Sequence, residues 1–365
     1  MRILYVINNF SIGGAETGLL HLIDSGFFED ASVEVVALFK GTNQLLQRLE
    51  DRGVAARTLI HEADMKYHLM PKAYTLLRKE LRAYDPDLVL LSLPQANIVG
   101  RLAAWDLRAK VVTFEHNVRY GKALYKPLLR MTSKYVDAVL YDSERTRMAV
   151  EKNYTSYKTR PWLYTPLVSL KENTVVRDYA HSDPVKILTA SRLNEQKNHA
   201  TSIRAIGLLR DRGYLAQLTI AGEGEQRGAL EALVTSLNLK DHVLLPGFVD
   251  DWSGLRKESD IFLQPSLWEG LCIGVLEAMA DGMPVVASDV GGMQDYGKDG
   301  HNMLKITEPT NAALVADLVA SLIDSEERCE QIGQHAAEDA LRLFGEETVK
   351  QQLKDVFGHL RRLVA

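Results

Sequence analysis

The chain has 365 residues, more than twice the length of a typical domain, so we expect two domains instead of one core. Hydrophobic residues make up 46% and charged residues 25%, a composition that excludes collagen-like, disordered and polytopic membrane proteins. Two cysteines, Cys272 and Cys329, are too few for a disulfide framework, and no apolar run reaches the ~20 residues of a membrane span. We therefore expect a cytoplasmic protein without an export signal.

The net charge of −5 is divided unevenly along the chain. Residues 1–171 contain 24 lysines and arginines against 18 aspartates and glutamates, a net charge of +6. The remaining residues contain 19 against 30, a net charge of −11. The basic first half favours an anionic partner, such as a membrane surface, a phospholipid or a phosphate-bearing acceptor, and the acidic second half argues against nucleic acid.

Short apolar runs alternate with amphipathic stretches in the first half, the pattern of a parallel sheet with helical crossovers. Strands are predicted at residues 2–7, 33–39, 88–93, 110–115 and 138–143. Helices are predicted at residues 16–26, 43–52, 72–83, 96–107 and 121–135. Residues 161–184 have weak periodicity and contain Thr165-Pro166, as expected of a linker.

The second half repeats the alternation. Strands are predicted at residues 185–191, 216–222, 242–248, 260–266 and 284–290, and helices at 198–212, 225–237, 252–258, 271–281 and 311–324. We predict two doubly wound Rossmann-like α/β domains, 1–165 and 180–345, with a polar C-terminal helix at 346–365 that packs back on the first. Two such domains facing across a cleft would present the carboxyl ends of both sheets, where ligands of open α/β sheets bind.

The densest group of chemistry-bearing residues follows the predicted strand at 260–266. Glu269 comes at its end, and Glu277 lies eight residues later, two turns into the next helix. If residues 270–273 form the turn, the first helix amides are unpaired donors that suit a phosphate. Glutamate pairs often have no function, but the surrounding helix is apolar, so a buried Glu277 would need a partner. Its carboxylate suits hydroxyl groups such as those of a ribose.

Two cations, Arg192 and Lys197, follow the predicted strand at 185–191. Together they can neutralise a diphosphate, although each alone would be an ordinary solvated cation. Residues 221–228 are close to a dinucleotide-binding loop, but the third glycine comes one residue late and two glutamates crowd the pyrophosphate position. A tight strand-to-helix turn is the better interpretation, and an NAD-dependent oxidoreductase is only an alternative.

The first half offers fewer candidates. Gly13 and Gly14 join the first strand to the first helix, where they can bring the backbone close to a ligand or simply begin the helix. His116 ends the strand at 110–115 and can face a ligand or be structural. No histidine, cysteine and aspartate cluster has metal-ligand spacing, so we expect no metal and no cofactor.

A row of cations recurs at four-residue spacing in the predicted helix at 121–135: Lys122, Lys126, Arg130 and Lys134. The apolar stripe expected to face the core consists of Leu124, Leu128, Met131 and Tyr135. The cations then lie largely on the opposite face, with Leu129 beside them. This face is either solvated or meets an anionic membrane, where Leu129 would touch acyl chains.

Taken in order, these motifs resemble the family 4 retaining glycosyltransferases of GT-B architecture over nearly the whole chain. The matching elements are Ser191-Arg192 through Lys197, Gly222-Glu223-Gly224, Leu245-Pro246-Gly247-Phe248, Pro265-Ser266 with Glu269-Gly270, Glu277-Ala278-Met279-Ala280, Gly282 with Pro284-Val285-Val286-Ala287, Gly291-Gly292, Gly13-Gly14-Ala15-Glu16 and His116. The chain departs from the family pattern at Asp295, where glutamate is more frequent, and at Thr165-Pro166, where an Asn-Gly turn is usual.

The resemblance implies a nucleotide diphosphate sugar as donor, which we expect to be a UDP-sugar. Arg192 and Lys197 would bind its diphosphate and stabilise the leaving nucleotide without a metal. Glu277 would hold the ribose and Glu269 the sugar hydroxyls. The remaining donor-side residues implied are Gly13, Gly14, Gly222, Gly270, Leu271 and Cys272, with His116 near the sugar and the β-phosphate.

The expected reaction is retaining transfer of a hexose or an N-acetylhexosamine to an acceptor hydroxyl, with the leaving phosphate helping to take the acceptor proton. We expect a lipid-linked or cell-envelope glycan as acceptor, reached from the inner face of a membrane through the cationic helix. A soluble small-molecule acceptor is the alternative. An epimerase or phosphorylase of the same fold, and a non-catalytic sugar-nucleotide-binding protein, are further alternatives, although the latter would have lost the charged residues that are present here.

Overall fold

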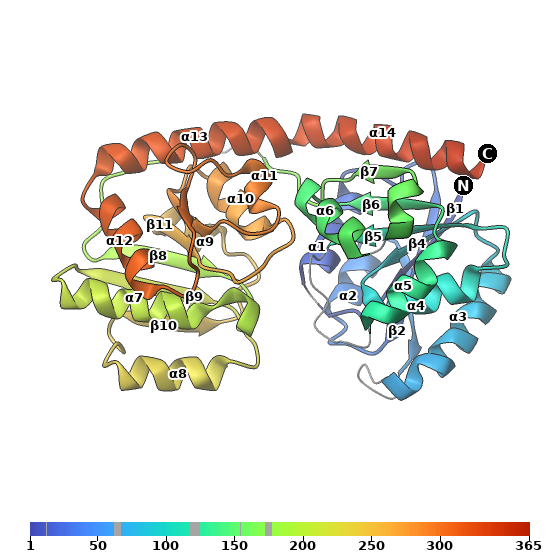
Figure 1. Ribbon diagram of the computed structural model, residues 1–365, viewed down its shortest axis with the longest axis horizontal. Coiled ribbons are helices and arrows are strands. Elements are labelled where there is room, and N and C mark those ends of the chain that lie inside the picture. The colour runs from blue at the N-terminus through green and yellow to red at the C-terminus, as the bar shows by residue number, and fades with distance from the viewer. Residues whose placement is uncertain (12, 62–66, 117–124, 154, 172–176) are drawn as a thin grey trace. The chain divides into compact units, whose positions relative to one another are not determined.

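The computed structural model describes residues 1–11, 13–61, 67–116, 125–153, 155–171 and 177–365 (Figure 1). The chain divides into two compact units. Unit 1 contains Met1–Ser169 and Glu347–Ala365, and unit 2 contains Leu170–Glu346. The chain is therefore a two-domain Rossmann-like protein, in which unit 1 is built from two separate stretches of sequence.

Unit 1 contains a seven-stranded parallel sheet with strand order β3-β2-β1-β4-β5-β6-β7. The strands are β1 (Arg2–Ile7), β2 (Ser32–Phe39), β3 (Ala55–Ile60), β4 (Leu88–Ser92), β5 (Lys110–Glu115), β6 (Ala138–Tyr141) and β7 (Trp162–Tyr164). The five fully or largely buried strands are those that the sequence predicts. The sequence does not predict the two edge strands, β3 and β7, because half-exposed edge strands lack a continuous apolar run.

The helices of unit 1 are α1 (Gly14–Asp24), α2 (Gln44–Glu50), α3 (Met70–Tyr84), α4 (Pro94–Ala104), α5 (Tyr125–Thr132), α6 (Glu144–Asn153) and α14 (Glu346–Val364). Short 3₁₀ turns occur at η1 (Tyr67–Leu69), η2 (Ser133–Tyr135) and η3 (Thr155–Thr159). Helices α3 and α4 share one apolar core with β1, β2 and β4, and α4, α5 and α6 share another with β6. Helices α3, α4 and α5 therefore lie next to one another on the sheet.

The C-terminal helix α14 packs on unit 1 through an apolar face that includes Val349, Leu353 and Leu360. The ring of Phe357 meets that of Phe27 edge-on, with 5.5 Å between their centroids. Near the end of the helix, Arg361 forms an ion pair of 3.0 Å with Asp30. Contacts with the loop that follows α1 thus hold α14 on unit 1.

The buried face of the helix at 121–135 differs from the predicted apolar stripe. Tyr125, Leu129 and Thr132 are the buried residues of α5. Of the predicted stripe, Leu128 packs partly buried on the same core, whereas Met131 is 56% exposed. Tyr125 packs among the side chains of β6 and accepts a hydrogen bond from Gln95, so the aromatic ring decides which face of the helix turns inward. Leu129 is thus unable to touch acyl chains. Lys122 and Leu124 lie outside the described residues.

Unit 2 contains a six-stranded parallel sheet with strand order β10-β9-β8-β11-β12-β13. The strands are β8 (Val185–Ala190), β9 (Ala216–Ala221), β10 (Val243–Gly247), β11 (Ile261–Gln264), β12 (Val285–Ser288) and β13 (Leu304–Ile306). The predicted series is present, and the three-residue edge strand β13 is an addition to it. This order places the ends of β8 and β11 side by side at the centre of the sheet.

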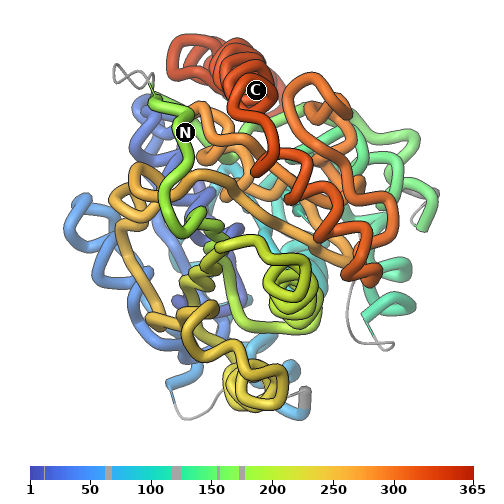
Figure 2. The backbone as a smooth tube through the Cα atoms, turned by 90° about the vertical axis from the view of Figure 1, so that its left-hand side faces the viewer, coloured from blue at the N-terminus to red at the C-terminus, as the bar shows by residue number. Residues whose placement is uncertain are grey.

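The helices of unit 2 are η4 (Glu195–Lys197), α7 (His199–Asp211), α8 (Arg227–Ser236), α9 (Ser253–Glu258), α10 (Ile273–Ala280), α11 (Met293–Tyr296), α12 (Ala312–Ile323) and α13 (Glu326–Phe344). Helices α7 and α8 run side by side (Figures 1 and 2). The amphipathic helix α13 lies beyond the predicted series, and it contacts α10 and α12. In the described part of the chain, no helix is both long and apolar enough to cross a membrane.

A buried ion pair lies inside unit 1. The side chains of Arg101, on α4, and Glu115, at the end of β5, are 0% and 2% exposed, and they pair at 3.0 Å. Thr113 accepts a hydrogen bond of 2.9 Å from Arg101, and the Tyr157 hydroxyl donates one of 3.0 Å to Glu115. These contacts join α4, β5 and η3. Glu115, which takes part in them, directly precedes His116 in the chain.

We expect Arg101→Met to lower the free energy of unfolding by about 3–5 kcal/mol, because it leaves the Glu115 carboxylate buried without its counter-charge. Urea unfolding followed by tryptophan fluorescence measures the change. The control is Arg52→Ala, since the Arg52–Asp24 pair is 33% and 50% exposed and should contribute at most about 1 kcal/mol. If Arg101→Met and Arg52→Ala lowered the free energy of unfolding equally, the buried pair would contribute no more to stability than the exposed pair does.

Candidate functional site

The centre of the candidate site is Glu269, in the loop after β11. It is 4% exposed, and its carboxylate accepts hydrogen bonds on both oxygens. Oε1 accepts from Lys197 Nζ and from Ser266 Oγ, each at 2.6 Å, and Oε2 accepts from Gln196 Nε2 at 3.1 Å. Three groups from two loops thus fix the orientation of one buried carboxylate.

Further hydrogen bonds connect the residues around Glu269 to the strands of the sheet. Gln264, the last residue of β11, donates to Ser266 Oγ at 2.8 Å and accepts from Thr189 Oγ1 at 3.4 Å. Gln196 also donates to the carbonyl oxygen of Trp268 at 2.9 Å. Because Thr189 lies in β8 and Gln264 in β11, the chain of hydrogen bonds ties the carboxylate to both central strands.

Lys197 and Arg192 lie on the loop between β8 and α7, as predicted, but in different surroundings. The Lys197 side chain is 15% exposed. Burial alone would lower the pKa of its ammonium group, but the Glu269 carboxylate outweighs burial and the pKa is raised. Arg192 is exposed and makes no side-chain hydrogen bond or ion pair with any residue in the described ranges. Lys197 is thus held in place by its ion pair, whereas the Arg192 side chain projects into solvent.

The backbone of this loop is fixed by two asparagines. The Asn194 side chain accepts a hydrogen bond of 3.2 Å from the Lys197 amide and so begins η4. Asn198 has a positive φ of 53° and donates to the carbonyl oxygens of Pro265 and Pro309 at 3.0 and 2.8 Å. Asn198 therefore fastens the Lys197 loop to the Glu269 loop.

Helix α10 begins at Ile273, four residues after Glu269 and two residues later than the predicted helix at 271–281. Cys272, immediately before the helix, has a positive φ of 62°, and the first amides that follow lack acceptors within the helix. Leu271 and Cys272 are buried, and burial together with Glu269 raises the pKa of the Cys272 thiol to about 12. The thiol is therefore protonated at neutral pH and unsuited to act as a nucleophile.

Glu277, in the second turn of α10, is only partly buried, and its nearest cation is Arg256. Its carboxylate is 3.9 Å from the Arg256 guanidinium, and its side chain is 30% exposed. Burial raises the pKa of Glu277, opposed by Arg256 and reinforced by Asp281. Arg256 itself lies over the ring of Trp252, 4.3 Å from its centroid, and bonds to Asp281 at 2.5 Å. The carboxylate is thus poised at the surface, only partly neutralised.

Two glycine positions explain why the loops can approach so closely. A Cβ on Gly222, with φ +154°, would lie 1.9 Å from the carbonyl oxygen of Ser191, and one on Gly291, with φ +58°, would lie 2.1 Å from that of Glu269. Both positions therefore exclude other residues. In unit 2, the glycine loop after β9 packs backbone to backbone on the Arg192 loop, as expected of a tight strand-to-helix turn.

The first-unit candidates lie at the ends of β1 and β5. Gly13 precedes α1 and Gly14 opens it, and a Cβ on Gly14 would meet no atom of the described residues within 4 Å. His116 is 8% exposed, its Nε2 is 2.8 Å from Ser92 Oγ, and burial lowers its pKa to about 3. It is therefore a neutral imidazole at physiological pH. Lys126, Arg130 and Lys134 are exposed, and Lys122 lies outside the described residues.

The structure thus brings together Lys197, Glu269, Gly270, Leu271 and Cys272. Arg192 lies on the same loop as Lys197, and Glu277 lies on the helix that follows Cys272. Sequence reasoning missed Gln196, Ser266 and Arg256, which hold the two glutamates. Ser266 could have been suspected, because it lies three residues before Glu269 in a loop, within reach of its carboxylate. Among the described residues, no group of three histidines, cysteines or acids could hold a metal ion.

Comparison with known proteins gives two adjacent family matches. The model described as "Glycosyltransferase Family 4" matches residues 12–161, and the one described as "Glycosyl transferases group 1" matches residues 173–339. A putative glycosyltransferase, EpsD of Bacillus subtilis, is 27% identical over 309 residues, which cover 78% of this chain and 80% of that protein. A putative colanic acid biosynthesis glycosyltransferase of Salmonella typhimurium, WcaL, is 26% identical over 47% of this chain and 44% of its own.

Solved structures show the same fold. The Anabaena protein HepE, in a complex with UDP and glucose, aligns with a TM-score of 0.82 at 20% identity, covering 98% of this chain and 99% of its own. Sucrose-phosphate synthase from Thermosynechococcus elongatus aligns with a TM-score of 0.80 at 18% identity, covering 99% of both chains. Both alignments span the two units.

The Lys197–Glu269 pair predicts a pH dependence of stability. The pKa of Lys197 is higher in the folded state than in the unfolded state, where it is about 10.4. The contribution of the ion pair to the free energy of unfolding is therefore fully present below the unfolded-state pKa, and it is lost as the pH rises through the folded-state pKa. The difference in unfolding free energy between the wild type and Lys197→Met should therefore be constant near neutral pH and shrink in strong alkali. Urea unfolding at a series of pH values measures it.

Lys240→Met is the control, since Lys240 is exposed in the same unit. Lys240→Met should change the free energy of unfolding only slightly at every pH of the series. A Lys197→Met effect that stays unchanged to the most alkaline pH at which the protein folds would contradict the assigned ion pair.

Proposed function

Because the chain belongs to the family 4 glycosyltransferases of GT-B architecture, we propose that it transfers a hexose or an N-acetylhexosamine, with retention, from a nucleotide diphosphate sugar to an acceptor hydroxyl. The observation that carries this proposal is the Lys197–Glu269 pair at the ends of the two central strands of unit 2. A cation suited to phosphate and a carboxylate suited to hydroxyls lie 2.6 Å apart, which matches a ligand whose diphosphate is joined directly to a sugar.

The cations would act on the leaving group. Departure of the nucleotide develops negative charge on the diphosphate, and fixed cations stabilise that charge most as the bond breaks. Exposed Arg192 can move to form a two-pronged contact with phosphate, whereas Lys197 is already held in place. The first amides of α10 would add neutral donors. We propose that these groups suffice and that transfer needs no metal.

The glutamates would hold hydroxyl groups. Glu269 would accept from the donor sugar, with Gln196 and Ser266 holding its orientation, and Glu277 would accept from the ribose. Cys272 is protonated and buried, and the Glu269 oxygens are engaged by Lys197, Ser266 and Gln196. These engagements favour a mechanism without an enzyme nucleophile, in which the leaving phosphate helps to take the acceptor proton on the same face of the sugar.

We propose UDP as the nucleotide, supported by the Anabaena protein of the same fold, which was solved with UDP and with UDP-glucose. From unit 1, neutral His116 and the Gly13-Gly14 turn would contribute to the donor site. The acceptor would be a lipid-linked or cell-envelope glycan, supported by a relative that carries colanic acid biosynthesis in its name and by the cationic surface of unit 1. Unit 1 would then act as the acceptor-binding domain and unit 2 as the nucleotide-sugar-binding domain.

The test is incubation of the pure protein with a panel of UDP-, ADP-, GDP- and TDP-sugars, with nucleotide release and thermal stabilisation as readouts. At least one nucleotide sugar should raise the melting temperature and release its nucleotide in the presence of a glycan acceptor. Product analysis distinguishes transfer from epimerisation and phosphorolysis. If no nucleotide sugar binds, the proposed function is rejected.

We expect Arg192→Ala, Lys197→Ala and Glu277→Ala each to lower turnover by about tens to thousands of fold, the scale of removing an electrostatic contact to a transition state. Steady-state kinetics of the folded variants measure the loss. Arg204→Ala, an exposed arginine on α7 of the same unit, is the matched control and should keep normal turnover. Near-normal rates in the three variants would overturn the assignment of these residues.

We expect full activity after exhaustive treatment with EDTA, because the two cations take the charge of the diphosphate. Initial rates before and after chelation measure this, with a metal-dependent glycosyltransferase treated in parallel as a positive control. A loss of activity that only an added divalent cation restores would show that the transfer requires a metal.

A further inference from the structure

Three large apolar side chains gather on one surface of unit 1, which we name the Trp105 patch: Trp105, Met131 and Tyr135. Trp105, just after α4, is 57% exposed, and Met131, on α5, is 56% exposed. The ring of Tyr135, four residues after Met131, lies 6.1 Å from that of Trp105. Because α4 and α5 pack on each other, the three side chains belong to one surface.

The elements that carry Met131 and Tyr135 also carry exposed cations. The Lys134 ammonium lies over the ring of Tyr135, 4.9 Å from its centroid, and Lys126 and Arg130 are exposed on α5. Within the described residues, none of these three cations forms an ion pair. Their charges are therefore available to an external anion.

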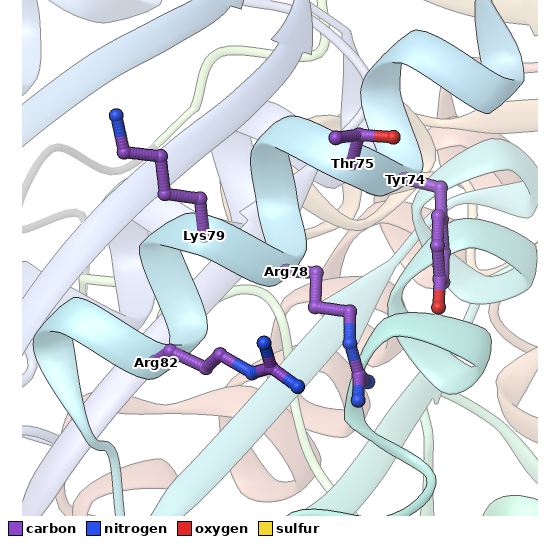
Figure 3. A pocket seen from close by; sticks show the side chains of 5 residues that line it. All are labelled: Tyr74, Thr75, Arg78, Lys79 and Arg82. Atoms are coloured by element: carbon purple, nitrogen blue, oxygen red, sulfur yellow. The ribbon is translucent and has the colours of Figure 1, made fainter.

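Helix α3 reaches the loop that carries Trp105, because Arg78 on α3 bonds to Asp106. A hollow on this helix is lined by Tyr74, Thr75, Arg78, Lys79 and Arg82. Figure 3 shows the guanidinium groups of Arg78 and Arg82 on the same side of α3, with Lys79 pointing away from them. Arg78 bonds to both oxygens of Asp106, the residue after Trp105, at 2.8 and 2.6 Å.

The carboxylate of Asp106 does not cancel these charges. The contact with Arg78 lowers the pKa of Asp106, and nearby Arg82 lowers it further. Arg78 pairs with Asp106, and Arg82 adds a second positive charge close enough to act on the same carboxylate. The patch thus combines an aromatic pair with cations on α3, α5 and η2.

A second pair of exposed apolar residues in unit 1 provides the contrast. Trp162 and Met148 are 44% and 51% exposed. The cation over the Trp162 ring is Arg147, at 4.6 Å, and it is bonded to both Glu144 and Glu151. The exposed fractions of the apolar side chains are similar in the Trp105 patch and in the Trp162–Met148 pair. The charge of Arg147 beside Trp162, however, is balanced by Glu144 and Glu151.

We propose that the Trp105 patch docks on an anionic membrane surface, with the Trp105 ring at the level of the lipid headgroups and the cations of α3 and α5 facing lipid phosphates. Tryptophan and tyrosine favour that interface because one end of each ring is apolar and the other polar. Lysine and arginine near an anionic surface add attraction that salt weakens. This proposal rests on the proposed membrane-borne acceptor and identifies the surface that would reach it.

The experiment is cosedimentation of the full chain with vesicles of equimolar phosphatidylglycerol and phosphatidylcholine, and with vesicles of phosphatidylcholine alone. We expect binding to the anionic vesicles only, weakened by added salt. Trp105→Ser and the charge reversal Arg130→Glu should each reduce the partition coefficient by about five- to tenfold. Brominated lipids in the vesicles should quench the fluorescence of Trp105, identified as the emission missing from Trp105→Phe.

Trp162→Ser and Met148→Ser are the matched controls and should bind as the wild type does, and thermal unfolding checks that every variant is folded. Equal binding to neutral and anionic vesicles, or equal losses in Trp105→Ser and Trp162→Ser, would reject the proposal. A wild-type dimer that Trp105→Ser makes monomeric, without vesicle binding, would assign the patch to contacts between copies instead. Nucleotide-sugar binding by the same samples tests the proposed function independently, because the variants lie outside the donor-site residues.

Discussion

The arrangement of the candidate site depends on one ion pair, between Lys197 and Glu269. A buried carboxylate is costly unless it is paired, and a largely buried ammonium is costly as well, so removing either residue leaves the other with an uncompensated charge. The loops that carry them leave neighbouring strands, β8 and β11, so the pair joins the two loops at their bases. Gln196, Ser266 and Asn198 then hold the geometry that the charges require.

The same ion pair also limits how the site can respond to a ligand. If Lys197 binds the donor phosphate as proposed, its hold on Glu269 would weaken, and Oε1 could then accept from another donor. Ser266 and Gln196 would still hold the carboxylate. Under the proposed function, phosphate binding and hydroxyl binding would thus be linked through one oxygen atom.

Much of this organisation can be predicted from the sequence because it depends on local patterns. Continuous apolar runs predict the central strands, and charged residues after those strands predict Arg192, Lys197 and Glu269 as candidate site residues. The pairing of Lys197 with Glu269 depends on β8 and β11 being neighbours in the sheet, which local patterns do not determine. The edge strands β3, β7 and β13 escape prediction, because a short or half-exposed strand carries little apolar signal. The buried face of α5 differs from the predicted one, because Tyr125 fills a space that only the assembled sheet defines. Gln196 and Ser266 as partners of Glu269 depend on loop conformations that spacing alone leaves open.

The placement of α14 has a consequence for how the protein is made. The sheet of unit 1 precedes unit 2 in the sequence, but Phe357, which packs on Phe27, follows unit 2. A growing chain on the ribosome can form the parallel sheet of unit 1 early, yet the contact with Phe357 must wait until unit 2 has been synthesised. Until α14 is made, part of the apolar surface of unit 1 therefore stays exposed to solvent.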